Sequence, residues 1–183
     1  MSDVDVLESV VRKNVALLEN VSPDQHGKPT LCPEYDVKAL TNHLAGWGRV
    51  IADGANDVES TVDGGSYTSE DPAGDYAKAA DDLVRGWREG GLDREVRFGT
   101  MAMPAAMTLS MTLMEEVTHG CDLALATGQP VPFTDAELET TLERAKATLP
   151  DDMRGNAFAP RIDVPADAPA LDRLLGFMGR RRS

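Results

Sequence analysis

Residues 104–128 read PAAMTLSMTLMEEVTHGCDLALATG, and this stretch decides the fold class. It is long enough for about seven turns of α-helix. Pro104 is typical of the first turn of a helix, and Gly128 is typical of the left-handed residue that follows one. Between them, apolar side chains occur nearly all round the helical surface, as they do in a helix that is buried on most sides. We therefore predict a central helix from Pro104 to Thr127 in an all-α protein.

Two polar side chains of this central helix lie among apolar neighbours. Glu115 and His119 are four residues apart, so they share one face of the helix. A carboxylate on a buried helix is unfavourable unless it is paired or binds a metal ion. Asp122 continues the same stripe, where it is either an acceptor or an extra ligand behind His119, or a carboxylate on the helix surface. The pattern indicates two ligands of a metal site.

Apolar residues at spacings of three and four predict further helices on both sides of the central one. Several starts carry recognisable signals: Asp36 as an N-cap, Pro72 in a first turn, and Thr134 at the start of a capping box. The expected ranges are residues 3–21, 36–54, 72–90, 134–149 and, for a short C-terminal helix, 171–178. Residues 94–103 are expected to form either a short hairpin or an extended crossover. Four long amphipathic helices favour an antiparallel four-helix bundle, with residues 1–183 as a single domain.

A third candidate ligand lies on the second of these helices. His43 is three residues after Leu40 and four before Trp47, so it shares their inner face. Together with Glu115 and His119 it would form a three-ligand site that keeps a position open for water or substrate, as catalytic zinc sites do. The alternative is that each histidine is a hydrogen-bonded residue of the core.

The spacing of Glu116 and His119 also matches one element of a di-iron site in a helical bundle. Such sites need a second Glu-x-x-His element and further carboxylates. His43 has Leu40 at the matching position, and His26 lies in a loop. The di-iron alternative therefore fails for lack of ligands.

The charge composition argues against a nucleic-acid partner, because 18 basic residues stand against 31 acidic ones, for a formal net charge of −13. The basic run from Arg180 to Arg182 is expected to be a solvated tail. No stretch approaches the roughly 20 apolar residues of a membrane-spanning helix, and the first residues do not resemble a signal peptide. We therefore expect a cytoplasmic protein without membrane contact.

The two cysteines are far apart in the sequence, and we expect no disulfide in a cytoplasmic protein. Cys121 comes two residues after His119, so it is expected to point away from the ligand face and into the core. Cys32 precedes Pro33 in a loop, where it is either structural or a reactive thiol.

Two blocks of the sequence resemble a known family. The first is PTLCPEYDV at residues 29–37, followed by Leu40 and by NHL at residues 42–44. The second is EEVTHGCDLA at residues 115–124. Both are similar to the DinB-like metalloproteins, and more closely to the actinobacterial branch related to mycothiol-dependent maleylpyruvate isomerase. The closing stretch VPADAPALDRLLGFMG, residues 164–179, is similar to the ending of that group.

The resemblance implies a DinB-like four-helix bundle with a zinc- or nickel-type site, whose ligands carry over as His43, Glu115 and His119. For some members it also implies thiol chemistry with mycothiol, described as S-transferase activity. The isomerase has an additional C-terminal domain, and we expect the 183 residues to be too few to include one. Cys121 stands where relatives often have Trp, and Tyr35 stands at another such place.

These observations favour a divalent-metal-binding protein that acts as a metal-dependent thiol (mycothiol) S-transferase or isomerase on a small electrophile. Zinc suits imidazole and carboxylate donors, and nickel is the alternative. Two other functions stay open: a non-catalytic stress protein that binds metal or a small ligand, and a metal-assisted hydrolase. The sequence thus leaves open whether the protein is an enzyme. The expected partners are a small-molecule substrate and a low-molecular-weight thiol. A homodimer is one oligomeric state that the sequence leaves open.

Overall fold

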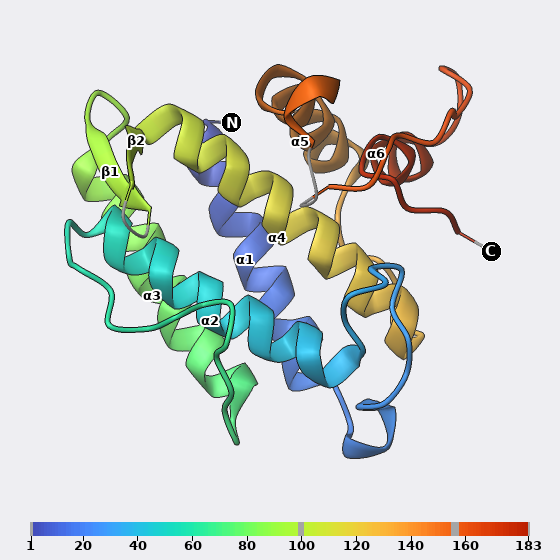
Figure 1. Ribbon diagram of the computed structural model, residues 1–183, viewed down its shortest axis with the longest axis horizontal. Helices are drawn as coiled ribbons and strands as arrows, with labels where there is room; N and C mark the ends of the chain where they lie inside the picture. Colours follow the sequence, from blue (N-terminus) through green and yellow to red (C-terminus); the bar gives the residue numbers. More distant parts are fainter. Residues whose placement is uncertain (1, 99–100, 155–157, 183) are drawn as a thin grey trace.

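The computed structural model describes residues 2–98, 101–154 and 158–182, and within them the chain is mostly helical (Figure 1). The described α-helices are α1 (Asp3–Glu19), α2 (Val37–Ala55), α3 (Pro72–Gly90), α4 (Ala105–Thr127), α5 (Asp135–Thr148) and α6 (Ala170–Phe177). Short 3₁₀ turns, η1 (Pro23–Gln25) and η2 (Asp151–Met153), follow α1 and α5. The prediction of a helical protein is confirmed, and each predicted helix ends within two residues of its observed bounds.

Side-chain caps fix where several helices begin. Asp36 accepts a hydrogen bond of 2.8 Å from a backbone N–H in the first turn of α2, as predicted for an N-cap. Thr134 and Glu137 form the predicted capping box at the start of α5. Ser2 and Asp5 form a further capping box on α1 that we did not predict. These caps satisfy amide groups that have no partner inside the helix.

A two-stranded antiparallel sheet precedes α4. Of the two predicted alternatives for this segment, the structure therefore shows the hairpin and not the extended crossover. It pairs β1 (Glu95–Phe98) with β2 (Met101–Pro104), while residues 99–100 lie outside the described residues. The sheet lies close to the end of α2, where a Cβ on Gly54 would stand 2.0 Å from the carbonyl oxygen of Arg97. Glycine at this position therefore allows the backbone of β1 to approach α2.

Helix α4 lies at the centre of the fold, between α1 and α2 on one side and α5 on the other (Figure 1). Both α1 and α2 lie against α4, and α3 packs on α1 and α2. Helix α5 contacts α4 on the side away from α2 and α3, and α6 packs on α5. Buried apolar side chains from all these helices form one cluster. The predicted burial of α4 on most sides is confirmed, because its buried residues occur along its whole length.

Among the described residues, no helix combines the length and the apolar character that crossing a bilayer requires.

Candidate metal centre

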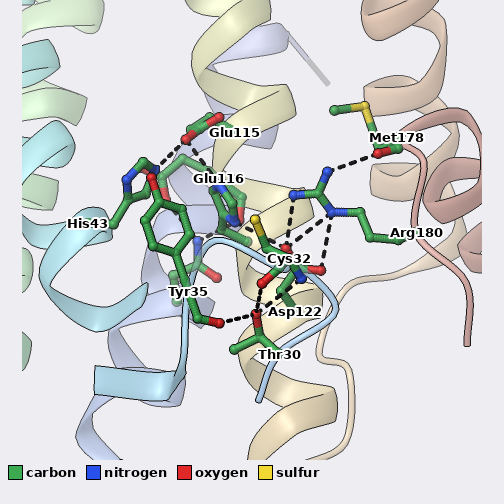
Figure 2. A network of polar contacts seen from close by, with 11 residues as sticks. Thr30, Cys32, Tyr35, His43, Glu115, Glu116, Asp122, Met178 and Arg180 are labelled. Atoms are coloured by element: carbon green, nitrogen blue, oxygen red, sulfur yellow. Dashed lines mark hydrogen bonds and ion pairs between the residues drawn. The ribbon is translucent and has the colours of Figure 1, made fainter. Parts of the chain in front are cut away.

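The structure brings the three predicted ligands together where α2 packs on α4. His43 lies on α2, and Glu115 and His119 lie on α4. Nε2 of His43 is 2.7 Å from Oε1 of Glu115, and Nε2 of His119 is 3.2 Å from the same oxygen. Figure 2 shows His43 and Glu115 pointing toward each other. One donor atom of each residue lies within 4.8 Å of the other two, so the group can hold a metal ion.

The helical spacing explains why these side chains converge. Leu40, one turn before His43, is buried in the core, so the face of α2 that packs inward also carries the imidazole. The side chains of His43 and His119 are 11% and 7% exposed, whereas that of Glu115 is 29% exposed. The group is thus enclosed on most sides and open to solvent beside Glu115.

Asp122 orients His119 from behind. It is fully buried, and its Oδ2 lies 3.1 Å from Nδ1 of His119. A carboxylate oxygen is placed to accept a hydrogen bond from Nδ1, while Nε2 faces Glu115. Carboxylate partners of this kind fix the tautomer and orientation of metal-binding histidines. The alternative of a surface carboxylate is wrong for Asp122, and its contact with His119 fits the acceptor role.

Charge interactions among the three side chains shift the pKa values of Glu115 and His119. Burial disfavours the charged forms of His119 and Glu115, but their mutual attraction outweighs it. The Glu115 carboxylate and the hydrogen bond to Asp122 raise the pKa of His119 to about 10. In turn, His119 and His43 hold the pKa of Glu115 well below its usual range. Glu115 is therefore an anion at neutral pH, and a metal ion would displace a proton from His119.

Glu116 follows Glu115 directly but contacts different helices. Its carboxyl group accepts hydrogen bonds from Nδ2 of Asn14 on α1, at 2.8 Å, and from the hydroxyl of Tyr76 on α3. Burial, which these bonds offset only in part, raises the pKa of Glu116 to about 7. Glu116 thus links α1, α3 and α4 and takes no part in the group of donors around Glu115.

A cavity of about 690 Å³ opens beside the three donors, within the size range of small-molecule sites. Its wall is mostly apolar. The ring of Tyr35 lies over that of His43, with centroids 4.6 Å apart, and meets His119 edge-on at 5.9 Å. Sequence reasoning did not place Tyr35 at the site. The larger apolar residues of the wall are Trp47, Ile51, Met111, Met114, Phe158 and Met178.

The prediction that the basic run is a solvated tail is wrong for Arg180. Its side chain is 10% exposed, lines the cavity and places Nη2 3.2 Å from Oδ2 of Asp122. Arg181 and Arg182 are exposed, as predicted. The charge pattern could not show which of the three arginines is buried. That depends on the path of the chain after α6, which returns Arg180 to α4 (Figure 2). The available signal was Gly179, a typical helix-ending residue directly before it.

The two cysteines are free and lie in different surroundings. Cys121 is fully buried in the core, as predicted, and burial raises the pKa of its thiol. Cys32 lies in the wall of the cavity and is 7% exposed. It follows that Cys32, and not Cys121, is the thiol next to the candidate site.

Two histidines and a glutamate on packed helices, beside a cavity of this size, place the chain among helical proteins with a candidate metal centre. A family model described as the mycothiol maleylpyruvate isomerase N-terminal domain matches residues 7–124, which include all three donors. The chain belongs to this family, as its two histidine blocks indicate.

Two curated relatives cover nearly the whole chain. Both are uncharacterized proteins of Mycobacterium tuberculosis, one from strain CDC 1551 / Oshkosh and one from strain ATCC 25618 / H37Rv. Each is 29% identical over 171 residues, which are 90% of this chain and 90% of the relative. No solved structure matches the chain significantly. The family model ends at residue 124, before α5, α6 and Arg180.

Proposed function

We propose that the chain is a single DinB-like domain in which α1 to α4 form an antiparallel four-helix bundle that holds a divalent metal ion. His43, Glu115 and His119 are the proposed ligands. Two imidazole nitrogens and a carboxylate oxygen suit zinc, with nickel as the alternative. The three donor atoms lie within 4.8 Å of one another, so small shifts of the side chains would place all of them at bonding distance from one ion. The hydrogen bond from His119 to Asp122 also fits, because it leaves Nε2 available to the ion.

We further propose that the protein is a thiol S-transferase or isomerase that acts on a small electrophile. When bound, the ion would supply a Lewis acid that holds a thiol such as mycothiol as its thiolate. The observation that carries this proposal is the cavity of about 690 Å³ beside the donors, which has room for an electrophile next to a thiol. Its apolar wall would limit the access of water, which competes as a nucleophile.

The proposed transfer balances without an oxidant or a reductant. The sulfur forms a bond to the electrophilic carbon, the thiol proton goes to solvent, and the leaving group departs with the electrons of the broken bond. In an isomerisation, the sulfur itself departs again with its electron pair after the geometry of the adduct has changed.

The chain's own thiols do not match the role of nucleophile. Cys121 is fully buried, and its raised pKa keeps the thiol protonated. Cys32 lines the cavity but does not belong to the group of donors formed by His43, Glu115 and His119. A low-molecular-weight thiol from solution is therefore the proposed nucleophile.

Cobalt substitution tests the thiol mechanism. In a cobalt-loaded Cys32→Ser, Cys121→Ala variant, mycothiol is expected to produce a sulfur-to-metal charge-transfer band, because the protein then contributes no sulfur of its own from cysteine. Absorption spectroscopy during the titration measures the band. An analogue with a hydroxyl in place of the thiol is the matched control and should leave the spectrum without it.

An unchanged spectrum at saturating mycothiol, with cobalt bound, would contradict the thiol mechanism. The metal site itself would survive that result. A screen for hydrolysis with the metal-loaded protein would then separate the hydrolase alternative from a non-catalytic binding protein.

Removal of the metal is expected to leave the protein folded, because the apolar cluster joins all the helices without help from the ion. Circular dichroism after chelation should retain its helical signal. Zinc at about 100 times its Kd should stabilise the native state by about 2.7 kcal/mol, which raises the Tm by roughly 5–11 °C for a chain of this size. Loss of the helical signal on chelation would instead make the ion a structural requirement.

A further inference from the structure

The turn that ends α6 delivers Arg180 to the site. Gly179 has a φ of 73°, the left-handed conformation that glycine adopts most readily. Its N–H donates to the carbonyl of Gly176 at 3.0 Å, and the N–H of Arg180 donates to the carbonyl of Leu175 at 2.8 Å. These two bonds form a Schellman motif, which ends a helix and reverses the chain. The position of Arg180 is therefore set by backbone hydrogen bonds.

The side chain of Arg180 is held at both ends of its guanidinium group. Nη1 donates to the carbonyl of Met178 at 2.9 Å, while Nη2 and Nε point at Asp122, with Nη2 3.2 Å from Oδ2 (Figure 2). With 10% of its side chain exposed, Arg180 is largely shielded from water, so its charge acts strongly on its neighbours. The guanidinium group is thus a fixed cation beside a fully buried carboxylate.

Asp122 connects this cation to a proposed metal ligand. The same atom, Oδ2, faces Nη2 of Arg180 and Nδ1 of His119, at 3.2 and 3.1 Å. A buried carboxylate that loses its cation is strongly unfavourable, so the Asp122 side chain would move toward another partner. That movement would weaken the hydrogen bond that fixes the ring of His119.

We propose that Arg180 is a positioning residue of the metal centre, which acts through Asp122 to hold His119 in the orientation that binds the ion. The inference rests on the proposed metal site and adds to it a segment beyond residue 124, where the family model ends. In physical terms, the C-terminal segment preorganises the site, because it holds His119 in the binding orientation before the metal ion binds.

Zinc affinity, measured by competition with a chromogenic chelator, tests the role. Arg180→Met is expected to weaken zinc binding about tenfold, the lower end of the effect of removing an outer partner of a ligand. Arg180→Lys should recover most of the affinity, because an ammonium group can also pair with Asp122. Arg182→Met is the matched control: Arg182 is exposed, pairs with Asp172 at the surface and should bind zinc like the wild type.

A double-mutant comparison tests whether Arg180 acts through Asp122. Once Asp122→Asn has removed the carboxylate, adding Arg180→Met should change zinc affinity less than twofold, because the residue through which it acts is absent. The cobalt ligand-field spectra of Asp122→Asn and of the double variant should likewise agree. Both proteins lack an unpaired buried carboxylate at this position, so this pair decides the matter if Arg180→Met alone does not fold.

The outcomes separate the two proposals. A wild-type protein that binds no zinc overturns the metal site and the role of Arg180 with it. Wild-type zinc binding with unchanged affinity in Arg180→Met overturns the role of Arg180 alone. A further tenfold loss on adding Arg180→Met to Asp122→Asn overturns the connection through Asp122.

Discussion

Replacement of His119 by alanine is expected to abolish stoichiometric zinc binding. His119 supplies one of three proposed donors and contacts both Glu115 and Asp122, so its loss removes a ligand and leaves two carboxylates without their shared partner. Removal of an outer partner of a ligand lowers metal affinity by about 10–100-fold, and removal of the ligand itself should exceed that range. Zinc content after gel filtration, measured by elemental analysis, gives the result directly. His43→Ala and Glu115→Ala should behave alike.

Two matched controls make this prediction specific. His26→Ala removes the remaining histidine of the chain, which lies beside η1 and outside the donor group, so zinc content should not change. Glu116→Gln neutralises the neighbour of Glu115 and keeps an oxygen that can accept hydrogen bonds from Asn14 and Tyr76. It too should retain one zinc per chain. Full zinc content in any one of the three ligand variants would remove that residue from the site.

Trp87→Ala is expected to cause the largest loss of stability among the changes considered. Trp87 is 1% exposed on α3, which packs on both α1 and α2. Truncation of a buried aromatic residue to alanine costs about 3–5 kcal/mol, since it removes apolar contacts and leaves a cavity. At roughly 2–4 °C per kcal/mol for a chain of this size, the Tm of the metal-free protein should fall by about 6–20 °C.

The indole N–H of Trp87 narrows the range of stability loss that we expect. Nε1 is buried without a hydrogen-bond partner among the described residues, so the tryptophan carries an unfavourable group that truncation also removes. We therefore expect a loss in the lower half of the range. Trp87→Phe, which removes the N–H but keeps most of the apolar volume, is the control and should cost less than half as much. A Tm within 2 °C of the wild type for Trp87→Ala would contradict the packing described here.

The helices were predictable because their causes are local. Apolar spacing and caps such as Asp36 and Thr134 act within one or two turns of the chain, so they are visible without any tertiary structure. The pairing of Glu115 with His119 was visible for the same reason, because a separation of four residues places two side chains on one helix face. The hairpin before α4 was less certain in sequence, since both alternatives there are extended.

The candidate site was only partly predictable. The sequence placed His43 on an inner face, but whether its Nε2 comes near Glu115 depends on how α2 packs on α4. Arg180 was predicted wrongly as part of a solvated tail. Arginine residues near a chain end are usually exposed, and what buries this one is a turn that returns the chain to the core.

The sequence alone determined the helical class, the helix bounds to within two residues, the family, and the stripe of Glu115, His119 and Asp122. Each of these depends on residues that are close together in the sequence. The tertiary structure decided what lies around that stripe: the cavity, the ring of Tyr35 over His43, and the approach of Arg180 to Asp122. Those last two residues are separated by 58 positions. Their contact arises from the packing of the whole core, and no local spacing specifies how distant segments meet.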